Sequence, residues 1–178
     1  MRDFSKIKRI VLKIGTNTLT QNDRIDIGYI RHVAEQVSVL MRSGRQVLIV
    51  SSGAIGLGAN LLGIESGVSD LKMRQACAAI GQPLLMQEYR NAFAYYSVKT
   101  AQVLLTSSVL NHRKTYLNLR NAIETLLKIE TVPIINENDS VSLDEIGTAF
   151  GDNDTLSALV ASKIDADLLI MLTDIDSL

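Results

Sequence analysis

The segment Val47-Leu48-Ile49-Val50-Ser51-Ser52-Gly53-Ala54 joins an uninterrupted apolar run to a turn of small residues. A short run of Val, Ile and Leu without polar alternation predicts a strand that is buried on both faces of a sheet. Small residues that enter a helix expose backbone amides beside the positive end of the helix dipole, which suits an anion. The segment therefore predicts a buried strand that leads into a candidate anion-binding turn.

The same kind of apolar run occurs at four other places in the chain. Each run is short, rich in Val, Ile and Leu, and bounded by polar residues, as is typical of strands in a parallel sheet. We therefore expect buried strands at residues 10–14, 47–50, 101–105, 132–135 and 168–172.

Helical periodicity separates these runs. In the first helical stripe the apolar residues share one face, and Gly44 predicts the end of that helix. In the second helical region, Gly81 and Pro83 indicate a break or a restart. We expect helices over residues 30–41, 71–94 and 116–127, and a fourth that begins near residue 154.

Strands that alternate with helices predict an α/β fold with three layers, α/β/α, around a mainly parallel sheet. Residues 141–150 differ, because a polar turn at 144–147 lies between short flanks that can pair. This pattern predicts a small β-hairpin near residues 141–150. No repeat or linker divides the sequence, so we expect a single domain over residues 1–178.

Composition excludes several classes of function. The net charge is −1, with 18 basic and 19 acidic residues, so no overall field attracts nucleic acid or an anionic membrane. No apolar run approaches the roughly 20 residues that span a bilayer, and residues 1–8 lack the apolar core of a signal peptide, so we expect a cytoplasmic protein. One cysteine, Cys77, excludes an intrachain disulfide, and two histidines offer no zinc cluster. We expect no metal ligands from the chain.

Polar residues follow the predicted strands. Because ligands bind beyond the carboxyl ends of the strands in open α/β sheets, these residues are the candidates for chemistry. They are Lys13-Ile14-Gly15, Ser52-Gly53, Asn136-Glu137-Asn138-Asp139, Gly151-Asp152-Asn153-Asp154 and Thr173-Asp174.

Each candidate also has a structural interpretation. Lys13 alone could be a surface lysine at a turn, and Asp152 or Asp154 could cap the fourth helix. The glycines from Gly53 to Gly58 follow the order G-x-x-G-x-G, which matches neither a dinucleotide-binding nor a Walker A loop. A lysine and bare amides suit phosphate groups, whereas the acidic segments suit an ammonium group.

Taken in order, these motifs resemble those of the glutamate 5-kinases, within the amino-acid-kinase superfamily, and the resemblance covers the whole chain. The Ser-Ser-Gly-Ala segment favours this group, because acetylglutamate and uridylate kinases typically have a glycine triplet there. The matching motifs are Val11-Leu12-Lys13-Ile14-Gly15-Thr16, Ser51-Ser52-Gly53-Ala54-Ile55, Ile134-Ile135-Asn136-Glu137-Asn138-Asp139, Gly151-Asp152-Asn153-Asp154-x-Leu156-Ser157-Ala158 and Leu172-Thr173-Asp174.

The resemblance implies catalytic roles for four residues. Lys13 would contact the transferring phosphoryl group and the nucleotide, and Asp154 would hold the catalytic lysines in place rather than act as a base. The backbone amides of Gly15 and Gly53 would face phosphate oxygens or the reacting carboxylate.

The resemblance also implies how the substrates bind. Ser52, Asp139 and Asn153 would bind glutamate, while Thr173 and Asp174 would lie toward ATP. The implied reaction transfers a phosphoryl group from ATP·Mg²⁺ to the γ-carboxylate of L-glutamate, the first step of proline biosynthesis. The family also implies proline as a feedback inhibitor and a homo-oligomeric assembly.

Three alternatives remain open from the sequence. The chain could act on another substrate of the superfamily: acetylglutamate, aspartate, carbamate or a nucleotide. It could be an NAD-dependent oxidoreductase, which the glycine spacing disfavours, or a non-catalytic binding module.

One departure from the family concerns the ATP side. The family's catalytic domain continues with a nucleotide-binding portion that contains a second lysine. We therefore expect residues 1–178 to form a C-terminally incomplete amino-acid-kinase domain that holds the glutamate-binding portion and is inactive or nearly so by itself.

Overall fold

A five-stranded parallel sheet with the strand order β5-β6-β4-β1-β7 forms the centre of the protein. The computed structural model describes residues 4–21, 24–64, 67–141 and 153–173. All five predicted strands are confirmed, with ends that differ by up to two residues. They are β1 (Arg9–Ile14), β4 (Gln46–Ser51), β5 (Lys99–Leu105), β6 (Thr131–Glu137) and β7 (Leu168–Leu172).

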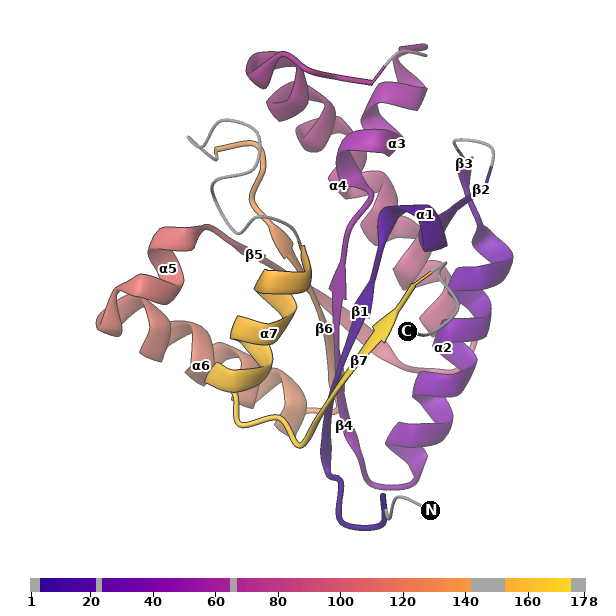
Figure 1. Cartoon of the computed structure of the whole chain (residues 1–178). Coiled ribbons are helices and arrows are strands. Elements are labelled where there is room, and N and C mark those ends of the chain that lie inside the picture. The colour runs from indigo at the N-terminus through magenta and orange to yellow at the C-terminus, as the bar shows by residue number, and fades with distance from the viewer. Residues whose placement is uncertain (1–3, 22–23, 65–66, 142–152, 174–178) are drawn as a thin grey trace.

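Helices cover both faces of this sheet, which confirms the three-layer α/β/α prediction (Figure 1). One face packs against α2 (Ile27–Arg42) and α4 (Leu71–Ala94), and α3 (Ala54–Leu61) packs on α4 beyond the strand ends. The other face packs against α5 (Ser107–Asn111), α6 (Arg113–Lys128) and α7 (Asn153–Lys163).

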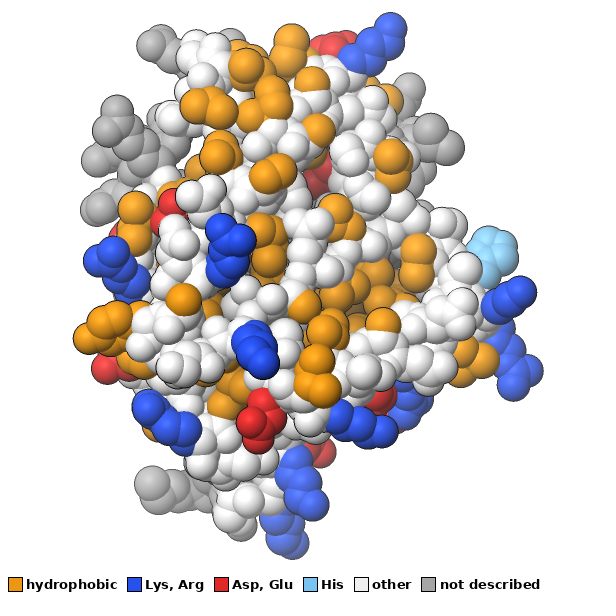
Figure 2. Space-filling model, turned by 180° about the vertical axis from the view of Figure 1, so that it is seen from behind, with side chains coloured by type: hydrophobic (Ala, Val, Ile, Leu, Met, Phe, Trp, Pro, Cys, Tyr) orange, Lys and Arg blue, Asp and Glu red, His pale blue; other side chains and the backbone are white. Residues whose placement is uncertain are grey.

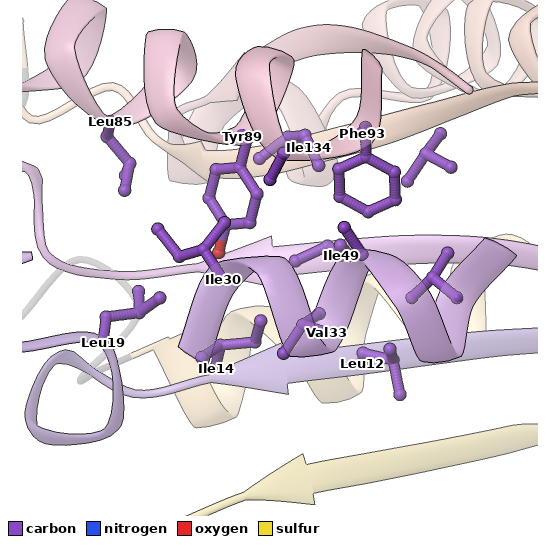
Figure 3. Close-up of a cluster of buried hydrophobic side chains, with 14 of the residues drawn as sticks. Leu12, Ile14, Leu19, Ile30, Val33, Ile49, Leu85, Tyr89, Phe93 and Ile134 are labelled. Atoms are coloured by element: carbon purple, nitrogen blue, oxygen red, sulfur yellow. The ribbon is translucent and has the colours of Figure 1, made fainter. Parts of the chain in front are cut away.

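Alternation along the strands divides the buried side chains between two cores. On β1, Leu12 and Ile14 face α2 and α4, whereas Val11 faces the layer of α6 and α7. The first core is drawn in Figure 3, where Tyr89 and Phe93 of α4 lie over the strands. Both aromatic residues are fully buried, and burying a large side chain stabilises a fold by about 1.5–3 kcal/mol. Strands and helices are therefore fixed together at the centre of the sheet.

The predicted break in the second helical region is wrong, because α4 runs without interruption for 24 residues through Pro83. Pro83 has no N–H, so the carbonyl of Ala79 loses its helical hydrogen bond. Both residues are exposed, so water can satisfy that carbonyl. Gly81 lies on the buried side instead, where a Cβ atom would come within 1.8 Å of the Ala54 carbonyl oxygen. The glycine is therefore a close-packing site between α3 and α4 rather than a helix end.

Several local features differ from the sequence prediction. Strand β7 is not buried on both faces: it lies at the edge of the sheet, and Met171 is 43% exposed. The short helices α1 (Thr16–Leu19) and α5 and the antiparallel pair β2 (Thr20–Gln21) and β3 (Arg24–Ile25) were not predicted. The hairpin expected near 141–150 falls almost entirely on residues 142–152, outside the described residues.

Charged side chains are spread over the surface. On the face shown in Figure 2, Lys and Arg side chains form separate groups with hydrophobic side chains between them, rather than one continuous basic surface. Within the described ranges, no helix combines the length and the apolar character that a membrane crossing requires.

Candidate active site

The carboxyl ends of β1 and β4 bring the first two candidate motifs together. Ile14 and Ser51 are register partners, and the backbone N–H of Ser52 donates to the carbonyl oxygen of Ile14 at 3.1 Å. Lys13 bends over the end of its own strand, since a Cβ atom on Gly15 would lie 3.3 Å from Lys13 Nζ. The lysine ammonium and the small-residue turn therefore lie together at the carboxyl ends of β1 and β4.

Lys13 forms an ion pair with Asp154 of α7. The lysine side chain is 14% exposed and the aspartate side chain 42% exposed, so the pair opens to solvent on the aspartate side. Asp154 lies in the first turn of α7, where the helix dipole favours a negative charge, and buried Leu156 and Val160 hold that helix on the sheet. The ion pair thus joins strand β1 to the start of α7.

Gly53 forms the turn from β4 into α3. It occupies the N-cap position with φ of +100°, a left-handed conformation that an L side chain rarely adopts. The predicted strand-to-helix turn is therefore confirmed, and glycine is required there by the backbone.

Asn153 connects the start of α7 to this turn. Its Nδ2 donates to Ser52 Oγ at 2.7 Å, to the Ser51 carbonyl oxygen at 3.0 Å and to Asn136 Oδ1 at 3.1 Å. Two hydrogens serve three acceptors, so one hydrogen is shared. Because the amide donates to all three, its carbonyl oxygen Oδ1 is the atom left to accept a hydrogen bond from a ligand.

A cavity of about 310 Å³ lies beyond these strand ends. It is polar, and six of the predicted site residues line it. These six are Lys13, Gly15, Ser52, Asn153, Asp154 and Thr173, together with Thr16, Asn17, Thr18 and Leu172.

Asp139 lies in a second cavity, of about 250 Å³, between α4 and the ends of β5 and β6. Ala54, two residues after Ser52, also lines this cavity, so the small-residue turn borders both spaces. Burial raises the pKa of the Asp139 carboxyl, and the positive charge of Arg74 partly offsets that rise. Asp139 is therefore a half-buried acid in a space that suits a cationic group.

Two predicted residues cannot be placed. Asp174, expected near the nucleotide, and Asp152, a candidate helix cap, lie outside the described residues. Asn153 is the first residue of α7, so Asp154 lies within the first turn rather than at the cap.

Gln82 and Gln102 were not predicted as site residues, and Asn136 was part of a candidate motif without a role of its own. Gln82 is only 8% exposed and hydrogen-bonds both Gln102 and Asn136. A glutamine buried in a helix gives no periodic signal by itself. The expected break at Pro83 further hid the fact that Gln82 points toward the sheet.

A cavity of larger volume, about 610 Å³, lies at the amino ends of the strands. It contains none of the predicted site residues, and Arg42 and Gln46 line it where α2 ends and β4 begins. Arg45, Lys128 and Glu130 also line it, so it holds charges of both signs. Size alone therefore does not identify the site, and the polar strand ends are the better candidate.

The fold and the site define the class of protein: an open, parallel α/β domain whose ligand site lies beyond the carboxyl ends of its strands, with a paired lysine and a small-residue turn. The chain belongs to the amino acid kinase family, whose sequence profile matches residues 8–178.

The chain is also similar to individual proteins of this kind. The chain is 52% identical over 183 residues to a glutamate 5-kinase of Methanosarcina mazei, an alignment that covers 98% of this chain and 48% of that protein. It is 47% identical over 180 residues to a glutamate 5-kinase of Streptococcus equi subsp. zooepidemicus, covering 99% of this chain and 66% of that protein. The chain thus spans about half the length of the Methanosarcina relative.

Proposed function

We propose that this chain binds L-glutamate beyond the carboxyl ends of its strands. We further propose that the site transfers the γ-phosphoryl group of ATP to the glutamate side-chain carboxylate. The product would be L-glutamyl 5-phosphate, which enters proline biosynthesis. One observation carries the proposal: Lys13, paired with Asp154, shares a cavity with Ser52 and Asn153.

The proposed chemistry needs little from the protein beyond position and charge. A glutamate carboxylate is ionised at neutral pH, so its oxygen can attack the γ-phosphorus without a general base. The new bond joins that oxygen to phosphorus, and the bond from phosphorus to the leaving ADP oxygen breaks. Lys13 would stabilise the charge on the transferring group, and Asp154 would hold the lysine in place.

The two cavities suit the two ends of glutamate. In the cavity of about 310 Å³, Ser52 and Lys13 offer hydrogen-bond donors to a carboxylate. In the smaller one, Asp139 would attract the substrate ammonium group. Thr173, at the edge of the first cavity, and Asp174 would lie on the nucleotide side.

Magnesium enters the proposal only together with ATP. Among the described residues, no group of three or more His, Cys, Asp or Glu is placed to hold a metal ion. Bound to the phosphates, Mg²⁺ would neutralise part of their charge.

Calorimetry with a panel of ligands tests the substrate. We expect L-glutamate to bind, and N-acetyl-L-glutamate, L-aspartate, carbamate and UMP to bind at least about tenfold more weakly, because acetylation removes the ammonium group and aspartate is too short. Because residues 1–178 are expected to be inactive or nearly so by themselves, the transfer is tested by trapping the acyl phosphate with hydroxylamine, in the presence of ATP and glutamate, with this chain and with a longer one that includes the family's nucleotide-binding portion. Preferential binding of another member of the panel would contradict the proposal.

Regulation and assembly extend the same proposal. Proline would compete with glutamate, and the chain would form homo-oligomers. Proline should therefore raise the apparent Kd for glutamate in competition calorimetry, and light scattering should give a mass above 19.5 kDa.

A further inference from the structure

A row of side-chain amides crosses the sheet beneath the two cavities. Asn153 Nδ2 donates to Asn136 Oδ1 at 3.1 Å, Asn136 Nδ2 donates to Gln82 Oε1 at 2.9 Å, and Gln82 Nε2 donates to the Oε1 of Gln102 at 3.1 Å. All three hydrogen bonds run in the same direction, from α7 through β6 and α4 to the edge strand β5. Such chains strengthen through mutual polarisation. We call these four residues the amide row.

Backbone groups fix the direction of the amide row. The N–H of Glu137 donates to Asn136 Oδ1 at 2.9 Å, and the Ser51 carbonyl oxygen accepts from Asn153 Nδ2 at 3.0 Å. A backbone N–H can only donate and a backbone carbonyl can only accept, so neither asparagine can turn its amide over without losing a hydrogen bond. Asn136 must therefore present its Nδ2 toward α4.

Gln82 is the residue that meets this donor. Asn136 is 3% exposed, so its Nδ2 would lack a partner in a buried environment if the Gln82 carbonyl oxygen were removed. An unsatisfied buried donor costs more than the hydrogen bond itself contributes, which would drive Asn136 to rotate. Rotation would remove the acceptor that Asn136 offers to Asn153.

The packing of α4 fixes the position from which Gln82 reaches the sheet. The preceding residue, Gly81, lies so close to α3 that a Cβ atom there would be 1.8 Å from the Ala54 carbonyl oxygen. Ala54 directly follows Gly53 in the small-residue turn. One stretch of α4 thus contacts the turn through Gly81 and the amide row through Gln82.

The direction of the amide row decides which groups face a ligand. Since Ser52 Oγ accepts from Asn153, the hydroxyl hydrogen of Ser52 is free to donate to a carboxylate. Asn153 keeps its Oδ1 as an acceptor beside the small-residue turn that borders both cavities, so Asn153 and Asp139 can both accept from one ammonium group. An amino acid carries both of these groups.

We propose that Gln82 is a positioning residue for amino-acid binding: through Asn136 it holds Asn153 and Ser52 in the orientation that binds a carboxylate and an ammonium group. The inference rests on the proposed function for the identity of the ligand, L-glutamate, but the orientation itself is a property of the protein without ligand. Gln82 also lines the smaller cavity, so the Asn153 NH₂ signals, measured without ligand, separate its action through Asn136 from direct contact with a ligand.

Side-chain amide signals in ¹⁵N-edited NMR spectra test the orientation without ligand. Gln82→Met keeps the length and burial of the side chain but removes the acceptor, and it should shift the Asn153 NH₂ signals. Leu85→Val is the matched control: it perturbs a fully buried residue of the same helix outside the amide row, and it should leave those signals in place. Unchanged Asn153 signals in folded Gln82→Met would overturn the proposal.

Calorimetry with L-glutamate supplies the second readout. Gln82→Met should raise the Kd about tenfold, the effect of one lost hydrogen bond, whereas Leu85→Val should stay within about twofold of the original protein even if its Tm falls. Equal losses of affinity in both variants would mean that Gln82 is merely structural.

Two further outcomes are separable. If the unmodified protein does not bind glutamate, the proposed function fails, and the NMR signals alone decide whether Gln82 orients Asn153. If Gln82→Met does not fold, Gln102→Met, which removes the exposed end of the amide row, decides instead. A smaller shift of the same Asn153 signals supports the proposal, and no shift overturns it.

Discussion

The two ends of strand β1 carry one basic residue each, and the structure uses them differently. At the amino end, Arg9 makes a two-pronged ion pair with Glu124, at 2.6 and 3.0 Å, and also donates to Gln46 and to the carbonyl oxygen of Ile164. At the carboxyl end, Lys13 pairs with a half-exposed Asp154 beside a cavity. The two side chains are equally buried, at 15% and 14% exposure, but the guanidinium of Arg9 bonds several protein partners, whereas Lys13 lines a cavity that can hold a ligand.

Charge and position on a strand therefore do not identify a functional residue by themselves. The planar guanidinium of Arg9 suits several simultaneous hydrogen bonds, which tie β1 to α6, to β4 and to the residue that follows α7. The compact ammonium of Lys13 suits a phosphoryl group that arrives and leaves. We expect the amino end to determine stability and the carboxyl end to determine chemistry, which the following substitutions test.

In a chain that includes the family's nucleotide-binding portion, Lys13→Met should have the largest effect, a loss of about 10²–10³-fold in glutamate-dependent phosphoryl transfer, because a preorganised positive charge is removed from the transition state. Its stability should change little, since the remaining Asp154 is partly solvated. Hydroxylamine trapping measures the transfer, and urea unfolding measures the stability. A large loss of stability would show that the carboxyl end is structural as well.

Arg9→Met should have the reverse profile. Removing one partner of a buried ion pair costs roughly 3–5 kcal/mol, and we expect about 2 kcal/mol here because both side chains retain some exposure. The pKa of Glu124, which Arg9 lowers mainly through their hydrogen bond, should rise toward its ordinary value. Urea unfolding and carboxyl NMR titration check both effects, while glutamate affinity should stay unchanged.

Asp139→Asn should weaken glutamate binding about tenfold while stabilising the fold at neutral pH. Burial raises the pKa of Asp139 above its unfolded value, so the folded protein holds the proton more tightly. Stability is therefore greater below the unfolded pKa and falls as the pH rises through the folded pKa. The variant should melt higher than the original at pH 7 and at the same temperature at acidic pH; a lower Tm at pH 7 would contradict this.

Asp167→Asn should have the smallest effect, with the opposite dependence on pH. The backbone N–H groups of Lys8 and Arg9 each donate to Asp167 Oδ2 at 2.8 Å, and they lower its pKa. The stability that this carboxylate contributes is present above the unfolded pKa and is lost as the pH falls through the folded pKa. Thermal melts at neutral pH should show a fall of roughly 1–2 °C, absent at strongly acidic pH.

The sheet could be predicted from sequence because buried parallel strands need continuous apolar runs, such as Val47 to Val50 and Val132 to Ile135. Helix α4 could not be predicted in full, since the effect of Pro83 depends on which side of the helix faces water. The edge position of β7 was also hidden, because an apolar run does not state how many neighbours it has.

Part of the candidate site could likewise be predicted from the sequence, and part could not. Lys13, Ser52 and Asp154 were found because polar residues directly follow apolar runs, and parallel strands place such residues at one edge. Gln82 was missed because it lies more than 50 residues from Asn136, and only folding brings the two amides to 2.9 Å.

The layers, the strands and the strand ends at which polar groups gather follow from the sequence, because burial of apolar surface acts on local patterns. Folding decides which positive charge is bonded by several protein partners, which one lines a cavity, and how the amides of Gln82, Asn136 and Asn153 point. Those outcomes depend on the distance and direction between groups on different elements, and such geometry exists only once the elements pack.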